Sequence, residues 1–296
     1  MIRDPYRVDL ASGPLQATIL PSYGMLVASL KWQGVELLRR IDNLESAAAK
    51  GSTAGIPLLY PWANRLDGLG YKAAGRQVVL DPSSPFLHFD GNGLPIHGVP
   101  WAKVPWRVVK SASSLLTARL DWSGDLMSVF PFPHKLEMEV ELGDALSIVV
   151  NVIADRDPVP VSFGFHPYFG LSEVARAGWR LHLPSMQKLL LDARGIPMGA
   201  RTGFAARDDA LGMTIYDDGF ALESNPARLA LSGGGRMIAV DFLEGFLFAQ
   251  VYAPKGQDLV ALEPMTAPTN ALASGEDLPI VKPGEKFTAK FRVTVV

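Results

Sequence analysis

The sequence contains no cysteine among its 296 residues. Disulfide bonds, thiolate metal sites and a cysteine nucleophile are therefore excluded. It also lacks an uninterrupted apolar run of about 18 residues, the length that a membrane-spanning helix requires. The first residues, MIRDPYR, contain no apolar stretch of the kind found in signal peptides. We therefore expect a cytoplasmic protein without a membrane anchor.

An excess of charge of either sign is also missing. The 28 Lys and Arg residues nearly balance the 30 Asp and Glu residues, and the net charge is -2. Proteins that bind nucleic acids usually carry a basic stripe, so we expect no nucleic-acid partner. No linker rich in proline and serine divides the chain. An all-β domain can exceed about 200 residues as one unit, and we predict a single domain over residues 1–296, as a monomer or weak homodimer.

Helical periodicity is scarce, and only residues 44–50 suggest a short helical turn. The dominant period is two. Residues 136–142 alternate apolar and acidic side chains, Gly143-Asp144 follows, and residues 145–152 form a second β-like run. This pattern predicts a β-hairpin. Residues 286–295 alternate in the same way, and further strands are expected at 77–80, 106–110, 115–122, 237–242 and 247–252. The sequence therefore predicts an all-β fold of antiparallel sheets packed face to face.

Four segments differ from ordinary strands and turns, because each places a polar or titratable residue among aromatic residues, glycine and proline. They are residues 55–65, 94–98, 163–169 and 262–272. Two histidines and a carboxylate are sufficient for proton transfer near neutral pH. Neighbouring aromatic rings suit a sugar, whose C–H face stacks on a ring while its hydroxyls accept and donate hydrogen bonds. The residues alone leave this as one interpretation among several.

The four segments together resemble the aldose 1-epimerase (galactose mutarotase) family over about residues 55–272. The resemblance is carried, in order, by Asn64-Arg65, His97-Gly98, His166-Pro167-Tyr168-Phe169 and Leu262-Glu263-Pro264. It implies a galactose mutarotase-like β-supersandwich with few short helices. It also implies an isomerase that interconverts the α and β anomers of an aldose and uses neither a metal nor another cofactor.

The resemblance also implies roles for individual residues. Glu263 corresponds to the general base that takes the proton of the anomeric hydroxyl, and His166 to the general acid that protonates the ring oxygen. His97 would assist at the same oxygen or at a neighbouring hydroxyl. Arg65 would bind sugar hydroxyls with its rigid fork of donors. An aspartate would bind the ring hydroxyls, and Asp217 matches the family pattern better than its neighbour, Asp218.

Further sugar contacts are expected from Asn64 and from the aromatic residues Trp62 and Tyr168. The alternative for the aromatic residues is a place in the core. Glu263 has a structural alternative in pairing with Arg65, and Arg65 has one in pairing with Asp67. Three other histidines, His88, His134 and His182, are expected to be structural. The Gly-rich segment 231–236 precedes a strand and lacks a phosphate-loop ending, so it predicts a hairpin loop.

Three other functions remain open from the sequence. The two histidines and Glu263 could hold a metal, although no short-range ligand pair supports this. The chain could be a carbohydrate-binding or sensor protein without turnover. It could also act on a hexose 6-phosphate, for which Lys72, Arg76 and Lys103 are candidate cations. Pro167 stands where galactose mutarotases commonly have serine, and a single glycine, Gly98, stands where they commonly have two. These departures put galactose itself in doubt as the substrate.

Overall fold

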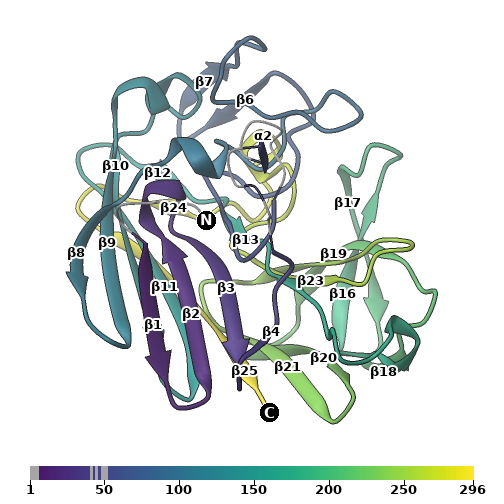
Figure 1. The fold of residues 1–296 in the computed structure, drawn as a ribbon. Coiled ribbons are helices and arrows are strands. Elements are labelled where there is room, and N and C mark those ends of the chain that lie inside the picture. Colours follow the sequence, from purple (N-terminus) through teal and green to yellow (C-terminus); the bar gives the residue numbers. More distant parts are fainter. Residues whose placement is uncertain (1–6, 41–42, 44–45, 48–52) are drawn as a thin grey trace.

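The computed structural model describes residues 7–40, 43, 46–47 and 53–296. The helical turn expected at 44–50 lies outside these residues, apart from 46 and 47. Strands dominate the described part (Figure 1). Its named helical elements are short: α2 (Ala271–Ser274), η1 (Pro21–Tyr23), η2 (Trp101–Lys103), η3 (Gly124–Ser128) and η4 (Arg176–Gly178). None of the described helices has the length and apolar sequence needed to cross a membrane.

The largest sheet has nine antiparallel strands in the order β18-β15-β20-β21-β25-β11-β10-β9-β8. Its strands are β8 (Arg107–Ser111), β9 (Leu115–Trp122), β10 (His134–Leu142), β11 (Ala145–Ala154), β15 (Arg180–Leu183), β18 (Arg207–Ala210), β20 (Ala227–Gly233), β21 (Arg236–Glu244) and β25 (Lys286–Val295). The predicted hairpin at 136–152 is confirmed as β10–β11. In β10 the apolar residues are buried and the alternating lysine and glutamate residues are not, because side chains point to opposite faces of a strand.

A second sheet has eight strands in the order β17-β16-β19-β22-β23-β13-β5, with β14 also paired to β23. Its strands are β5 (Leu58–Leu59), β13 (Gly164–Phe165), β14 (Tyr168–Phe169), β16 (Met186–Leu191), β17 (Pro197–Phe204), β19 (Tyr216–Leu222), β22 (Phe248–Ala253) and β23 (Val260–Met265). Every residue of β23 is buried. This sheet therefore has a central strand that is covered on both faces.

Three smaller sheets complete the described structure. They comprise β1 (Val8–Ser12), β2 (Leu15–Leu20), β3 (Leu26–Trp32) and β4 (Val35–Glu36); β6 (Gly70–Ala73) and β7 (Arg76–Val79); and β12 (Val159–Pro160) and β24 (Ile280–Val281). In Figure 1 the sheet that contains β1 and β2 lies in front of β11, and both strands contact β10. The strands predicted at 77–80, 106–110, 115–122, 237–242, 247–252 and 286–295 are confirmed as β7, β8, β9, β21, β22 and β25. The segment 231–236 forms the β20–β21 hairpin.

The main core lies between the two large sheets. The rings of Phe165 from β13 and Phe291 from β25 have centroids 4.9 Å apart, and Phe246 packs against both. In β23, Val260 and Leu262 belong to this core. Because side chains alternate along a strand, the next residue, Glu263, points away from the core. The fold therefore presents a carboxylic acid on the opposite face of a buried strand.

Candidate active site

Glu263 and His166 are brought together by strand register. β13 and β14 both pair with β23, so that Gly164 lies opposite Met265 and Tyr168 lies opposite Ala261. His166 falls midway between these pairs and therefore lies opposite Glu263. The His166 Nε2 atom is 3.3 Å from the Glu263 Oε1 atom. Residues almost one hundred positions apart thus form a buried acid–base pair.

The local sequence explains why β13 can approach β23 so closely. A Cβ atom on Gly164 would lie 2.8 Å from the carbonyl oxygen of Pro264 and 3.0 Å from the Cβ atom of Ala63. Real Cβ contacts are not this short, so only glycine fits this position. The Gly-Phe-His segment is therefore needed to seat the imidazole above the carboxyl group.

Burial favours the neutral form of both partners. It raises the pKa of Glu263 well above its usual value, and the negative charge of Asp217 raises it further while Arg65 lowers it. Burial also lowers the pKa of His166, with a further lowering from His97. Among the described residues, Nδ1 of His166 and Oε2 of Glu263 have no hydrogen-bond partner. Buried polar atoms are nearly always satisfied, so these two atoms are available to a ligand.

His97 approaches the pair from a separate loop. Its ring centroid is 5.7 Å from that of His166, with the rings at 80°. The backbone N–H of Asn64 donates to Nδ1 of His97 over 3.2 Å. The hydrogen of the neutral imidazole must therefore reside on Nε2. Burial, assisted by the charge of Arg65, lowers the pKa of His97 to about 3. His97 is thus a neutral donor near pH 7.

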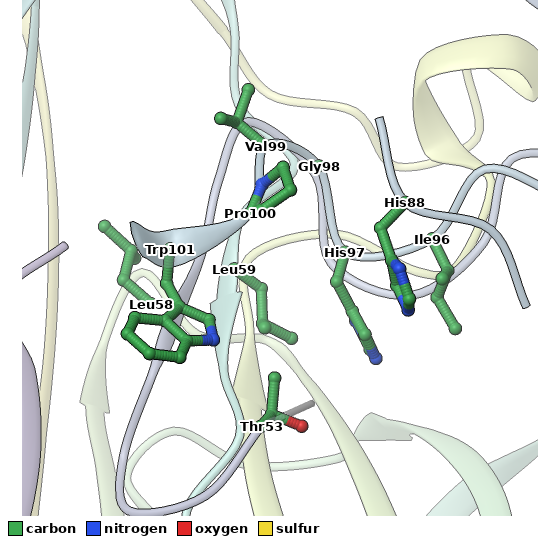
Figure 2. Close-up of a pocket in the computed structure, with 10 residues that line it drawn as sticks. All are labelled: Thr53, Leu58, Leu59, His88, Ile96, His97, Gly98, Val99, Pro100 and Trp101. Carbon is green, nitrogen blue, oxygen red and sulfur yellow. The ribbon is translucent and has the colours of Figure 1, made fainter. Parts of the chain in front are cut away.

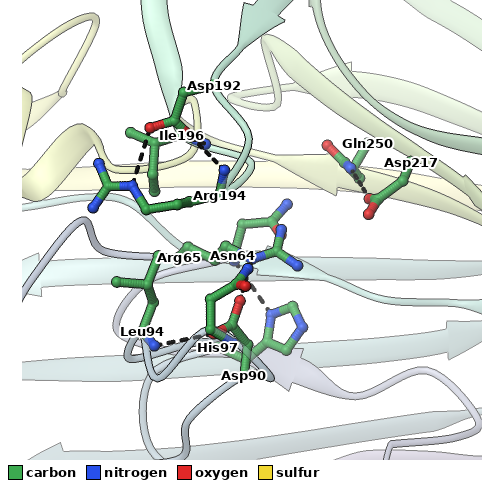
Figure 3. A network of polar contacts seen from close by, with 11 residues as sticks. Asn64, Arg65, Asp90, Leu94, His97, Asp192, Arg194, Ile196, Asp217 and Gln250 are labelled. Carbon is green, nitrogen blue, oxygen red and sulfur yellow. Dashed lines mark hydrogen bonds and ion pairs between the residues drawn. The ribbon is translucent and has the colours of Figure 1, made fainter.

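Two turns of the same construction flank Arg65 (Figure 3). In the first, Oδ1 of Asp90 accepts from the backbone N–H groups of Asn92 and Leu94, and Oδ2 accepts from Nε of Arg65 over 2.7 Å. Among the described residues, Nε is the one nitrogen of the Arg65 side chain with a hydrogen-bond partner, so the two Nη groups can bind a ligand. The pairings with Asp67 and Glu263 considered from the sequence are not formed. The actual partner, Asp90, was not anticipated.

The second turn lies between β16 and β17. Oδ1 of Asp192 accepts from the backbone N–H groups of Arg194 and Ile196, in the same pattern as Asp90. Gly195 has φ +78°, and a Cβ atom there would lie 2.9 Å from Nη1 of Arg65. Glycine therefore permits this turn to close over the guanidinium group.

Asp217 lies on β19, and its Oδ1 accepts a hydrogen bond from Nε2 of Gln250 over 2.7 Å. Gln250 is itself buried and pairs with Glu263 across β22 and β23. Asp218 instead forms an ion pair with Lys188 at 2.8 Å. Of the two neighbouring aspartates, Asp217 is therefore the one directed to the site. Gln250 was missed because nothing in its local sequence marks it; only the pairing of strands reveals it.

The aromatic residues divide between the site and the core. Tyr168 stacks on His166 with centroids 4.0 Å apart and planes at 12°, and its hydroxyl pairs with Thr53. Its ring therefore supports the imidazole and does not offer that face to a sugar. Tyr252, which was not anticipated, meets His166 edge-on at 5.9 Å. Trp62 is 1% exposed, belongs to the main core and packs against Tyr71. Trp62 is therefore better explained as a core residue than as a sugar platform.

Asn64 supports the site mainly through its backbone. Its N–H fixes His97, while its side-chain amide is directed to the sulfur of Met265 at 3.7 Å. Two of the histidines expected to be structural have partners outside the acid–base pair: His134 contacts Tyr60, and His182 contacts Ser232. His88 differs, because it lines a recess beside His97. No group of three or more histidine, aspartate or glutamate residues within the described ranges is arranged to hold a metal.

Comparisons with known proteins agree with this architecture. A family model described as "Aldose 1-epimerase" matches residues 7–294. The uncharacterized protein YihR of Escherichia coli K12 is 24% identical over 97% of this chain and 92% of its own length. The crystal structure of Slr1438 from Synechocystis sp. PCC 6803 is 25% identical, with a TM-score of 0.80 over 98% of this chain and 95% of that one. A galactose mutarotase-like protein from Clostridium acetobutylicum has a TM-score of 0.83 at 17% identity, over 97% and 94% of the two chains.

Proposed function

The chain belongs to the aldose 1-epimerase family, and we propose that it interconverts the α and β anomers of an aldose by general acid–base catalysis. The observation that carries the proposal is the buried pair of His166 Nε2 and Glu263 Oε1 at 3.3 Å. Each partner also has a second polar atom without a partner among the described residues. The pair has the two functional groups that ring opening requires.

In the proposed reaction, the Glu263 carboxylate removes the proton from the anomeric hydroxyl. The C1–O5 bond breaks as the C1=O1 double bond forms, and O5 takes a proton from Nε2 of His166. Rotation about C1–C2 turns the other face of the aldehyde to O5. Re-closure reverses both proton transfers, and the site returns to its starting state. An acid and a base each contribute about 10²–10⁴-fold to such a reaction.

The two protonation states of the pair differ by one proton transfer. Ring opening starts from the carboxylate and the imidazolium and ends with both groups neutral. Burial favours the neutral form of each group. The charged state is favoured by Arg65, whose positive charge lowers the pKa of Glu263. The neutral pair then has the protonation needed to close the open-chain aldehyde. Each protonation state of the pair thus serves one direction of the reaction: the charged pair opens the ring and the neutral pair closes it.

The remaining residues act on the sugar hydroxyls. His97 donates from Nε2 to the ring oxygen or an adjacent hydroxyl. The free Nη groups of Arg65 donate to hydroxyls, and Asp217 accepts from them. We expect Gln250 to fix the carboxylate of Asp217 through the hydrogen bond that the two share. These contacts hold the ring so that the anomeric centre meets the acid–base pair.

The proposal predicts a bell-shaped pH profile. The active pair carries one proton in total, since either the imidazole or the carboxyl group holds it. Addition of a second proton at low pH, or loss of the single proton at high pH, removes one catalytic partner. The two apparent pKa values belong to the coupled pair and not to either residue alone. A flat rate between pH 5 and 9, with proton transfer shown to limit the rate, contradicts this assignment.

The direct test is anomer exchange followed by NMR on freshly dissolved α-aldoses. The wild-type protein is expected to accelerate exchange over buffer, and His166→Asn to lose at least about 10²-fold in kcat. His182→Asn serves as the matched control, because His182 is bound to Ser232 away from the site. A sugar-binding protein without turnover gives no acceleration, and equal losses in the two variants contradict the role of His166.

A further inference from the structure

A recess adjoins the proposed acid–base pair on the side of His97. It is partly open to solvent. Its lining is formed by Thr53, Leu58, Leu59, His88, Ile96, His97, Gly98, Val99, Pro100 and Trp101 (Figure 2). In Figure 2 the side chains of Leu59, Thr53 and His97 face the same space. The mechanism described above uses only His97 from this set.

The chemistry of the recess is predominantly apolar. Leucine, isoleucine, valine, proline and tryptophan side chains form most of the described lining, and none of these lining residues is lysine, arginine, aspartate or glutamate. Of the cations considered for a phosphate, Arg76 is bound to Asp157 and to the carbonyl oxygen of Pro131. Among the described lining residues, a phosphate dianion would find no lysine or arginine to offset the loss of its hydration. An apolar group would instead gain from leaving water.

The position of the recess indicates which part of a sugar it would meet. Thr53 is paired with the hydroxyl of Tyr168, whose ring stacks on His166. The recess therefore begins beside both neighbours of that imidazole, His97 and Tyr168. The described lining does not include Glu263 or Asp217. The recess thus adjoins the imidazole side of the site and lies away from the carboxylates.

The covalent structure of a pyranose determines which substituent lies next to the ring oxygen. Its ring oxygen is bonded to C1 on one side and to C5 on the other. When the anomeric hydroxyl is at Glu263 and the ring oxygen is at His166, C5 lies on the side of the ring oxygen opposite to C1, and the ring of His97 lies beside that of His166, with centroids 5.7 Å apart. We infer that the recess receives the C5 substituent. The enzyme then prefers an aldose in which that substituent is a methyl group, a 6-deoxyaldohexose, and rejects a 6-phosphate.

This inference rests on the proposed function, and a substrate panel separates the two. Wild-type protein is assayed by anomer-exchange NMR with a parent aldohexose, its 6-deoxy analogue and its 6-phosphate, in both the galacto and gluco series. We expect kcat/KM to be about 10-fold higher for the 6-deoxy sugar than for the parent in at least one series. We expect it to be at least about 10²-fold lower for the 6-phosphate.

Two results overturn the inference while leaving the proposed function intact. One is a 6-phosphate that reacts as fast as its parent sugar, and the other is a 6-deoxy sugar that reacts no faster than its parent in either series. Absence of acceleration with every aldose, by contrast, contradicts the proposed function itself. The panel therefore distinguishes the two failures.

Variants of the recess provide a second test with a matched control. Leu59 and Leu189 are buried in the same small apolar cluster, but only Leu59 lines the recess. Leu59→Ala is expected to lower the 6-deoxy preference at least about threefold, because the methyl group loses its packing partner. Leu189→Ala is expected to leave the preference unchanged. If Leu59→Ala does not fold, Ile96→Val removes one methyl from another part of the lining. An unchanged ratio in a folded recess variant overturns the inference.

Discussion

Two buried carboxylic acids, one in each large sheet, have opposite surroundings. Asp241 on β21 of the nine-stranded sheet is 5% exposed, and Glu263 on β23 of the eight-stranded sheet is 1% exposed. Arg228, Arg292 and Thr294 all donate hydrogen bonds to Asp241. Among the described residues, His166 is the one polar partner of the Glu263 side chain, at Oε1, and Oε2 has none. The two carboxyl groups are thus similarly buried, but Asp241 has hydrogen-bond partners for both oxygens and Glu263 does not.

The pKa directions follow from these surroundings. Burial acts to raise the pKa of Asp241, but the hydrogen bonds and charges of the two arginines outweigh it, and the pKa is lowered. For Glu263, burial and the charge of Asp217 outweigh Arg65, and the pKa is raised. The eight-stranded sheet therefore keeps a carboxyl group in a state that costs stability. Such strain is typical of a site that acts on a ligand.

The largest effect is expected from Glu263→Gln. This change keeps the shape of the side chain and removes the base, so kcat is expected to fall at least about 10²-fold. The free energy of unfolding is expected to stay level or rise, because a buried titratable group is replaced by a neutral amide. Anomer-exchange NMR and urea unfolding measure the two quantities. Strong destabilisation with retained activity would reverse our assignment of the two acids.

The next largest effect is expected on the pH dependence of stability, from His134. His134 is satisfied at both ring nitrogens, by the Tyr60 hydroxyl and the Phe132 carbonyl, whereas Nδ1 of His166 has no partner among the described residues. Burial lowers the pKa of His134 to about 4, although the bond to Phe132 opposes the shift. His134 is therefore still neutral in the folded state at pH values where the unfolded chain, with a pKa near 6.5, is already protonated.

The sign of the pH dependence follows directly. The contribution of His134 to the free energy of unfolding is fully present above pH 6.5, and it is lost as the pH falls towards 4. The loss approaches about 3 kcal/mol. Urea unfolding between pH 7 and pH 4.5 is expected to show a smaller decrease for His134→Gln than for wild type. Equal slopes would mean that the pKa of His134 is the same in the folded and unfolded chains.

Asp241→Asn is expected to have the converse effect to Glu263→Gln. It removes a carboxylate that two arginines hold, but the side chains of these arginines are 55% and 44% exposed and can be rehydrated. The free energy of unfolding is therefore expected to fall by only about 1–2 kcal/mol, and kcat to remain within about twofold of wild type. Asp9→Asn, at an exposed acid beside Arg7, serves as the control and is expected to change stability less.

The sequence predicted the strands of alternating pattern and the motif histidines and glutamate, because both signals are local. β10 and β25 alternate buried and less buried residues along their length, which a reader of the sequence can see. Gln250 and Asp90 gave no such signal, since their importance depends on which strand or arginine lies opposite. Trp62 could not be assigned from the sequence, because an aromatic residue beside Asn64-Arg65 fits a core as well as a site. The roles of such residues thus depend on contacts between distant parts of the chain, which the local sequence pattern does not show.

Asp90→Asn tests an acid that combines both situations. Like Asp241, Asp90 has hydrogen-bond partners for both oxygens, but it also contacts Arg65 of the site. The asparagine oxygen can still accept from the backbone of the turn, but its amide cannot accept from Nε of Arg65. We therefore expect the guanidinium to lose its anchor and KM to rise about 5–10-fold, with a smaller change in kcat. Asp192→Asn is the matched control, because this acid builds the same turn and its side chain binds the exposed Arg194 in place of Arg65. If both variants raise KM equally, the integrity of the turns controls Arg65 and the carboxylate contact does not. If neither variant raises KM, Arg65 holds its position without Asp90. Acids with a full set of hydrogen bonds, such as Asp90 and Asp241, then have a structural role even beside the site.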